Sequence, residues 1–200
     1  TIKAALLKAG MKNAYNLLVN RAGSGARANY FFSKQEKAIY DGLSSKDIEA
    51  LDKIIMLRRI AEIDKNFDVR GEKRPIHPNK LNFESAQIGL AEKRKELGDA
   101  KFNELNDKAN KYFDAFKSLL DSMYDEGLIN EDLYNRLKDL DYQPRMFIEH
   151  VFDMDELSMR DINLSANQVK KIKDGSEDEI MFDSRFLLAV YSKCTFSRIA

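Results

Sequence analysis

The segment from about residue 105 to residue 126 repeats its apolar side chains with the period of an α-helix, and this pattern constrains the fold more than any other feature. The apolar positions lie one, three or four residues apart and form one stripe on a helix: Leu105, Ala109, Tyr112, Phe113, Phe116, Leu119, Leu120, Met123 and Tyr124. Gly127 follows, suited to the left-handed residue after a helix end. Asn130 precedes two acidic residues and is a candidate N-cap. The pattern predicts an antiparallel helical hairpin over about residues 105–140, with its turn between Gly127 and Asn130.

Similar spacing predicts further helices over about residues 3–20, 29–42, 46–64, 84–97 and 184–199. Ser44 or Ser45 can cap the third of these, and Gly98 ends the fourth. The chain holds three prolines and nine glycines in 200 residues, which leaves few interruptions of long helices. Apolar and polar residues nowhere alternate over more than a few positions, so no strand is predicted. The sequence therefore predicts an all-α fold, a multi-helix array of six to eight helices without a sheet.

We divide the chain into three predicted segments. Residues 1–45 form a basic N-terminal helical segment with a flexible hinge from Gly23 to Gly25, residues 46–160 form the main helical domain, and residues 161–200 form a C-terminal helical segment. Because the sequence stops inside an apolar, aromatic-rich stretch, we expect the chain to continue into a longer parent polypeptide. No apolar run approaches the roughly 20 residues that a membrane-spanning helix needs.

Charge is balanced over the whole chain but not along it. Lys plus Arg and Asp plus Glu both total 33. Residues 1–40 hold seven bases and one acid, whereas residues 81–160 hold eleven bases and eighteen acids. The two regions could attract each other within one chain or between copies, or the basic region could contact nucleic acid. The candidate nucleic-acid or partner contacts are Lys3, Lys8, Lys12, Arg21, Arg27, Lys34 and Lys37.

No set of residues matches a catalytic motif, a metal site or a cofactor site, so we expect none of the three in this segment. His77 and His150 lie far apart in the sequence, without the ligand spacing of a zinc site, and are interpreted as loop or packing residues. Cys194 falls on the apolar side of the last helix and is interpreted as a small hydrophobic residue. Arg145, after Tyr142 and Pro144, is expected to tie the turn after the hairpin to neighbouring acids. The structural-turn residues are Gly127, Asn130, Tyr142, Pro144 and Arg145.

Several short phrases occur in an order that resembles a known pattern. They are Leu51–Ile60, Pro75–Pro78, Ser85-Ala86 with Glu96-Leu97-Gly98, Glu126–Tyr134, Tyr142–Arg145 and Ser184–Tyr191. Together they resemble the helical regions of large polyvalent proteins and of internal virion proteins of tailed bacteriophages. Arg145 stands where that pattern has an apolar residue, and the segment before residue 45 matches no part of it.

The resemblance implies a non-enzymatic helical segment of a phage virion protein, packaged in the capsid or tail as a structural or cargo protein. It further implies contacts with other virion proteins or with copies of itself, and delivery with the genome into the bacterial host cytoplasm. It carries over no catalytic residue. Two alternatives stay open: a scaffold module of a large phage enzyme, such as a polymerase or a wall-degrading protein, and a helical module that binds nucleic acid such as phage DNA.

Overall fold

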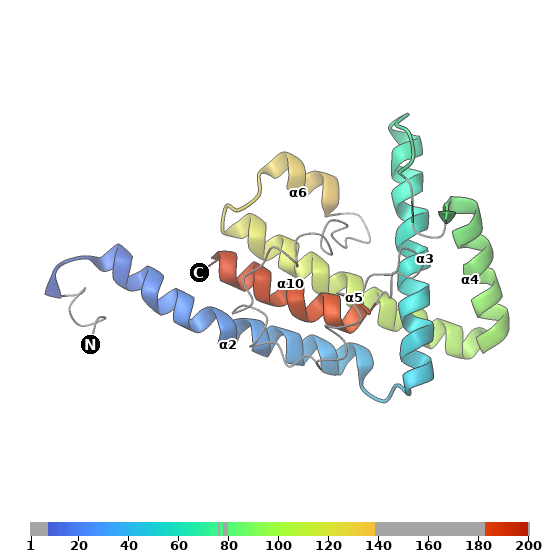
Figure 1. Ribbon diagram of the computed structural model, residues 1–200, viewed down its shortest axis with the longest axis horizontal. Helices are drawn as coiled ribbons and strands as arrows, with labels where there is room; N and C mark the ends of the chain where they lie inside the picture. The colour runs from blue at the N-terminus through green and yellow to red at the C-terminus, as the bar shows by residue number, and fades with distance from the viewer. Residues whose placement is uncertain (1–7, 76, 78–79, 139–182, 200) are drawn as a thin grey trace.

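The part of the chain that the structure describes is all-helical, as the sequence predicts. The computed structural model describes residues 8–75, 77, 80–138 and 183–199, and for residues 12–22 the backbone alone. Within these ranges it holds six α-helices and no strand (Figure 1). The helices are α2 (Lys12–Tyr40), α3 (Ser45–Val69), α4 (Phe83–Leu97), α5 (Asp99–Asp125), α6 (Glu131–Leu137) and α10 (Ser184–Ile199).

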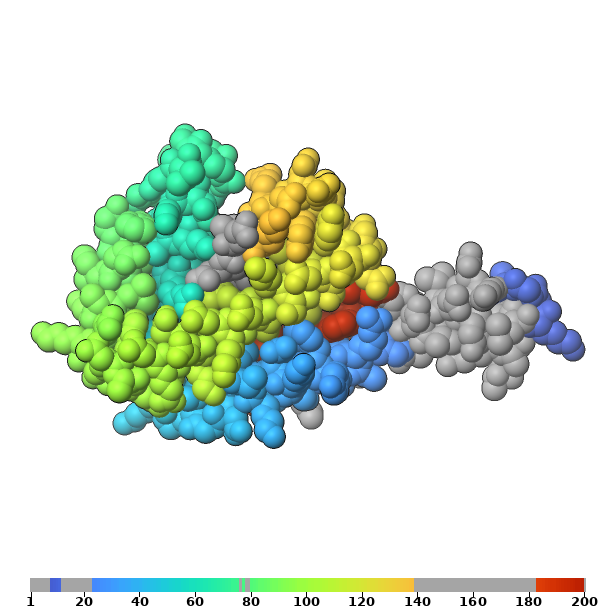
Figure 2. All heavy atoms as spheres, turned by 180° about the vertical axis from the view of Figure 1, so that it is seen from behind, coloured from blue at the N-terminus to red at the C-terminus, as the bar shows by residue number. Residues whose placement is uncertain are grey.

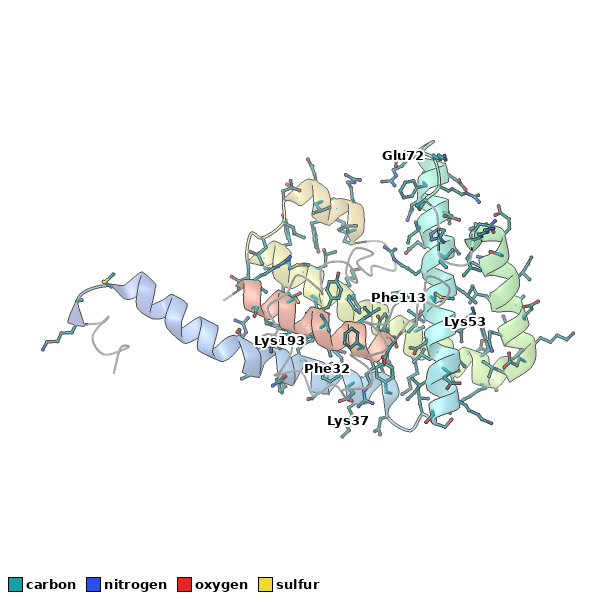
Figure 3. All side chains as sticks on the ribbon, in the orientation of Figure 1. Phe32, Lys37, Lys53, Glu72, Phe113 and Lys193 are labelled. Atoms are coloured by element: carbon teal, nitrogen blue, oxygen red, sulfur yellow. The ribbon has the colours of Figure 1, made fainter. Side chains whose placement is uncertain are left out.

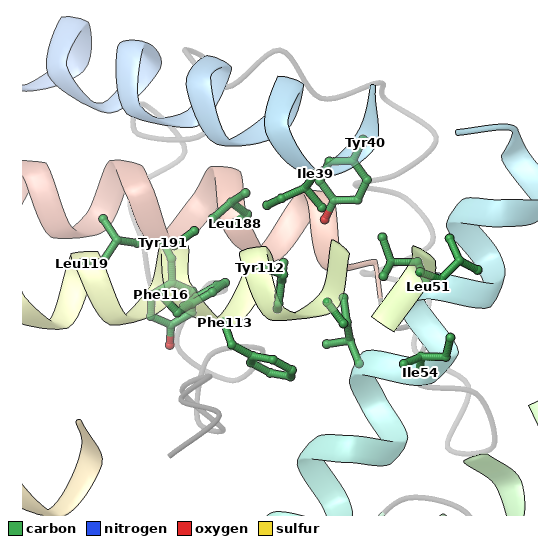
Figure 4. Packing of buried hydrophobic residues seen from close by; sticks show 14 of the residues in the cluster. Ile39, Tyr40, Leu51, Ile54, Tyr112, Phe113, Phe116, Leu119, Leu188 and Tyr191 are labelled. Atoms are coloured by element: carbon green, nitrogen blue, oxygen red, sulfur yellow. The ribbon is translucent and has the colours of Figure 1, made fainter. Parts of the chain in front are cut away.

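Helix α10 is the centre of the main core. It packs along α2 and also against α5, and α3 joins the same cluster of buried side chains (Figure 4). On the face seen in Figure 2, α10 is visible only in small areas between α2 and α5. Its residues from Phe186 to Ser192 are all buried. A helix that is buried all round has no polar face, which explains why α10 carries no charge between Arg185 and Lys193.

A smaller apolar cluster joins α4 to α3. Leu57, Ile60 and Ala61 of α3 are buried there against Ala86 of α4. Gly89 lies against the Leu57 side chain, where a Cβ at Gly89 would stand 3.0 Å from the nearest leucine carbon atom. Glycine at this position therefore allows the two helices to approach closely.

Helix α5 begins earlier than the apolar pattern predicts and then turns sharply into α6. It starts at Asp99, directly after Gly98, whose φ of +78° only glycine adopts readily. At the other end Gly127 has a φ of +70°, and the Asn130 side chain accepts a 2.9 Å hydrogen bond from the Leu133 N–H. The Tyr134 ring stacks on Tyr124 with 4.3 Å between the ring centroids. The last two residues of the predicted hairpin, 139 and 140, lie outside the described residues, as do Tyr142, Pro144 and Arg145 of the turn expected after it and His150.

The sequence predicts a break at Gly23-Ser24-Gly25, but α2 runs through all three residues. The reason is tertiary packing: Ser24 and Ala28 are buried on the side of α2 that joins the core. Packing of that kind offsets the roughly 1 kcal/mol that a glycine costs inside a helix. The break lies instead at Gly10, whose φ is +73°, directly before Met11 and the start of α2.

Helix α3 begins with a capping box. The Ser44 Oγ accepts from the Asp47 N–H at 3.2 Å, and an Asp47 carboxylate oxygen accepts from the Ser44 N–H at 3.1 Å. These bonds satisfy two backbone donors that would otherwise lack partners at the helix start.

Ser44→Ala is expected to lower the free energy of unfolding by about 1 kcal/mol, because it removes the side-chain acceptor of the cap. Urea unfolding of the variant and of Ser45→Ala measures the effect. Ser45, the exposed first residue of α3, is the matched control and should change stability by less than about 0.5 kcal/mol. Equal losses in the two variants would contradict the assignment of the cap to Ser44.

Candidate functional site

The exposed side of α2 brings together part of the predicted basic set. Arg27, Lys34 and Lys37 are exposed and lie on the same side of the helix as Tyr30, because the four positions are three, four and three residues apart. The Tyr30 side chain is 74% exposed, the most exposed aromatic residue among those described. Figure 3 shows Lys37 extending away from the helical body. We call these four residues the α2 face.

The three cations of the α2 face form few interactions with the rest of the described chain. The Arg27 guanidinium lies 5.2 Å from the centroid of the Phe196 ring on α10, which leaves its charge at the surface. Within the described ranges neither Lys34 nor Lys37 forms an ion pair. The acid nearest to them in sequence, Glu36, is paired with Arg185 of α10. Within the described ranges the α2 face therefore carries net positive charge that no acidic side chain offsets.

The other predicted contacts are not all placed. Lys8 is exposed and precedes α2. Lys12 and Arg21 lie within α2, in the part whose side chains are not described, and Lys3 lies outside the described residues. This first part of α2 extends beyond the ends of α10 and α5 (Figure 1).

A partly buried polar junction, which the sequence analysis missed, joins α10 to α2 and α3. Ser184 is the first residue of α10, and its Oγ donates to the Asp52 carboxylate on α3. The Ser184 N–H donates to the same carboxylate oxygen at 3.2 Å. The Tyr40 hydroxyl at the end of α2 lies 2.6 Å from the Ser184 Oγ. These bonds connect residues that are 132 and 144 positions apart in the sequence.

Burial governs the ionisation of the groups in this junction. Desolvation raises the pKa of the Asp52 carboxyl to about 7, although the hydrogen bonds from Ser184 act in the opposite direction. The nearby charges of Asp183 and Glu49 add to the increase in the pKa of Asp52. Desolvation also raises the pKa of the phenols of Tyr40 and Tyr112 well above the ordinary tyrosine value.

A second polar network, around Asp64, fixes the loop between α3 and α4. Asp64 is fully buried, and one of its carboxylate oxygens lies 2.6 Å from the His77 Nε2. Its other oxygen accepts from the Phe83 N–H at 2.8 Å, at the start of α4. His77 is 5% exposed, so it is a packing residue, one of the two roles expected from the sequence.

Arg74 continues this network at the surface. Its guanidinium forms a bidentate pair of hydrogen bonds with the Asp68 carboxylate, at 2.7 and 2.6 Å, and also donates to the Glu84 carboxylate at 3.0 Å. Hydrogen bonds from Arg74 lower the pKa values of the Asp68 and Glu84 carboxyls. The loop is thus tied to the end of α3 and to the first turn of α4.

The polar groups of the two networks are engaged in hydrogen bonds that link the helices to one another. The Ser184 hydroxyl is fully buried and engaged with Tyr40 and Asp52. Cys194 is buried in α10, and desolvation raises its thiol pKa to about 11, which disfavours the reactive thiolate. Within the part of the chain that is described, no group of three His, Cys, Asp or Glu residues could hold a metal ion.

Comparison of the chain with protein-family models, with curated proteins and with solved structures finds no match. None of the described helices combines the length and the apolar character needed to cross a bilayer.

Proposed function

We propose that this chain is a structural, non-enzymatic helical segment of a bacteriophage virion protein, packaged in the capsid or tail, and that the α2 face contacts its partner. The partner is another virion protein or a second copy of the chain. In this proposal the helical body holds α2 in place through α10, and α2 presents its outer side for assembly.

The positions of the phage-like phrases support the proposal. Leu51–Ile60 lies in α3, and Ser85-Ala86 lies in the first turn of α4, with Ser85 in the capping box of Asn82. Glu126–Tyr134 covers the turn into α6, and Ser184–Tyr191 is the first half of α10. Four of the six phrases therefore coincide with a helix or a helix boundary, whereas Pro75–Pro78 falls in the partly described loop before α4 and Tyr142–Arg145 lies outside the described residues.

The proposal rests mainly on one observation, that the α2 face exposes an aromatic ring among three cations. Aromatic and arginine side chains are enriched in protein interfaces, and the α2 face presents one of each, Tyr30 and Arg27. Tyr30 stands among three exposed cations on the outer side of the long helix α2, which is anchored to the body along its opposite side. In the sequence, the acidic excess of residues 81–160 supplies the opposite charge on a second copy.

Association of the chain with itself is the first test. We expect the weight-average mass in sedimentation equilibrium to rise with concentration, and more at low salt than at high salt. Arg27→Gln/Lys34→Gln/Lys37→Gln should reduce the association by about tenfold or more, because it removes the charges that attract the acidic surface. Lys95→Gln/Lys111→Gln/Lys117→Gln, at three exposed lysines of α4 and α5, is the control matched in charge and should leave the association unchanged.

A second candidate, binding of phage DNA, is favoured by the same three cations, which have an exposed tyrosine between them. Lysine and arginine side chains that contact phosphates release counterions from the DNA. The logarithm of the binding constant therefore falls linearly with the logarithm of the salt concentration, with a slope of about −0.9 for each phosphate contacted. Fluorescence anisotropy with a labelled DNA duplex distinguishes this candidate. Steep salt dependence that the triple variant reduces would support DNA as the partner, whereas self-association without DNA binding would support assembly between copies.

Absence of both interactions in the unmodified chain, or equal losses in the triple variant and its control, would contradict a role for the α2 face with these partners.

A further inference from the structure

The turn from α5 into α6 presents a surface that is both apolar and acidic. Helix α6 buries none of its residues, and its Leu133 side chain is 40% exposed. Leu128, in the turn between the two helices, is 43% exposed. Exposed acids stand at the end of α5 and at the start of α6, beside these two leucines. We call the whole set the α5–α6 corner: Asp125, Glu126, Leu128, Glu131, Asp132 and Leu133.

The distribution of charge distinguishes this corner from the helices before it. Residues 81–120, which hold α4 and most of α5, contain seven acids and seven bases. Residues 121–138 contain five acids and two bases, and the two bases, Arg136 and Lys138, lie at the far end of α6. Within residues 81–138 the acidic excess is therefore confined to the end of α5 and the start of α6.

Two acids of the corner lie where their own helix disfavours them. Asp125 is the last residue of α5 and Glu126 is its C-cap. The unpaired carbonyl groups at a helix C-terminus carry partial negative charge, so lysine or arginine would be more stable at both positions. Residues that lower local stability often serve a contact elsewhere. The positions of Asp125 and Glu126 therefore indicate a cationic partner for the corner.

The corner has a fixed shape before any partner binds. The Leu128 N–H donates to the Met123 carbonyl oxygen at 2.9 Å and closes the end of α5. The Tyr134 hydroxyl donates to the Asp121 carboxylate at 2.9 Å, and its ring stacks on Tyr124. These contacts hold α6 against α5. A surface that is already ordered loses little conformational entropy when it binds.

The α2 face has the complementary composition. It presents the Tyr30 ring among three cations, whereas the corner presents two leucines among four acids. Protein interfaces favour an apolar centre with a polar rim and opposite charges on the two partners. Helices α2 and α6 lie on opposite sides of α5 in both Figure 1 and Figure 2, and Lys37 extends away from the body in Figure 3. The α2 face of one copy therefore cannot reach the corner of the same copy.

We propose that the α5–α6 corner receives the α2 face of a second copy, so that copies of the chain join head to tail. The inference rests on the proposed function, in which the α2 face contacts a partner, and it specifies the partner surface. A contact between two different surfaces on opposite sides of the molecule leaves one of each open at the ends of a pair. Further copies can add there, so we expect the mass at high concentration to exceed that of a dimer.

Reversing the charge of each surface, alone and together, tests the contact. The two triple variants are Arg27→Glu/Lys34→Glu/Lys37→Glu on the α2 face and Asp125→Lys/Glu126→Lys/Glu131→Lys on the corner. In sedimentation equilibrium at low salt, each should associate more weakly than the unmodified chain by about tenfold or more, because like charges then face each other. The chain with both reversals keeps the original net charge and again brings opposite charges together. Its association should return to within about threefold of the unmodified chain.

The control reverses three exposed acids of α4 and α5 outside the corner, Glu92→Lys/Asp107→Lys/Asp114→Lys. Combined with the reversed α2 face, it has the same net charge as the double reversal but should not restore association. Restoration in this combination, or association that stops at the dimer, would overturn the proposal. Loss of association in the α2 variant without loss in the corner variant would also overturn it, while leaving the proposed role of the α2 face intact. An unmodified chain that does not associate would overturn both self-association and the corner.

Cross-linking of the unmodified chain covers the case in which the reversed variants do not fold. A carbodiimide joins lysine to a neighbouring carboxylate, and a mixture of ¹⁵N-labelled and unlabelled chains identifies the links between copies by mass spectrometry. We expect such links from Lys34 or Lys37 to Asp125, Glu126 or Glu131. Links between copies that join these lysines only to acids outside the corner would overturn the proposal.

Discussion

Phe116→Ala is expected to lower the free energy of unfolding by about 3–5 kcal/mol, the range for removing a fully buried phenylalanine ring. Phe116 has no exposed surface and lies in α5, where its ring centroid is 4.9 Å from that of Tyr112 and 5.3 Å from that of Tyr191 on α10 (Figure 4). The substitution leaves a cavity at the contact between α5 and the central helix α10. Urea unfolding followed by circular dichroism measures the loss.

The control for this prediction is another aromatic side chain, on the surface. Tyr30→Ala removes a ring of similar size from the α2 face and should change stability by about 0.5 kcal/mol or less. If Phe116→Ala were as mild as Tyr30→Ala, α5 would not pack on α10 as described.

Asp64→Ala is the second substitution with a large expected effect, about 3 kcal/mol or more. It removes the buried partner of the His77 ring and leaves the Phe83 N–H without its acceptor. Removing one member of a buried polar pair is strongly destabilising, since the remaining groups stay buried and lose their hydrogen bonds. Denaturant unfolding gives the total loss, and hydrogen exchange should locate the loosened region at the start of α4.

Asp68→Ala provides the matched control for Asp64→Ala. Asp68 lies four residues later on the same helix and also contacts Arg74, but its side chain is 46% exposed. An exposed pair of this kind contributes about 0–1 kcal/mol. A loss as large as that of Asp64→Ala would show that the surface contacts of Arg74, rather than the buried carboxylate, hold the loop.

Local patterns were sufficient to predict most of the helices. The stripe from Leu105 to Tyr124 predicted the greater part of α5, and the apolar run after Ser184 predicted α10 with the bounds that the structure has. Asn130 caps α6 through its own side chain, a contact that spans only three residues. Signals of this kind can be recognised in a sequence because both partners lie within one helical turn.

Features that depend on contacts between distant residues could not be predicted in the same way. The glycines at residues 23 and 25 indicated a hinge, but burial of Ser24 and Ala28 continues the helix through them. The junction of Asp52 with Tyr40 and Ser184 was missed because its members come from three helices and one pair is 144 residues apart. One feature of the sequence could have indicated that Asp52 has a polar partner in another helix. Asp52 directly follows the buried Leu51 and so lies at the border of the apolar stripe of α3.

The central claim, that this chain belongs to a phage particle, is tested most directly by quantitative mass spectrometry of gradient-purified particles from the source of the sequence. The account predicts that peptides from α2 to α10 sediment with the DNA-filled particles, in a constant ratio to the major capsid protein across the gradient. Peptides that stay in the soluble fraction and are missing from the particles would contradict it.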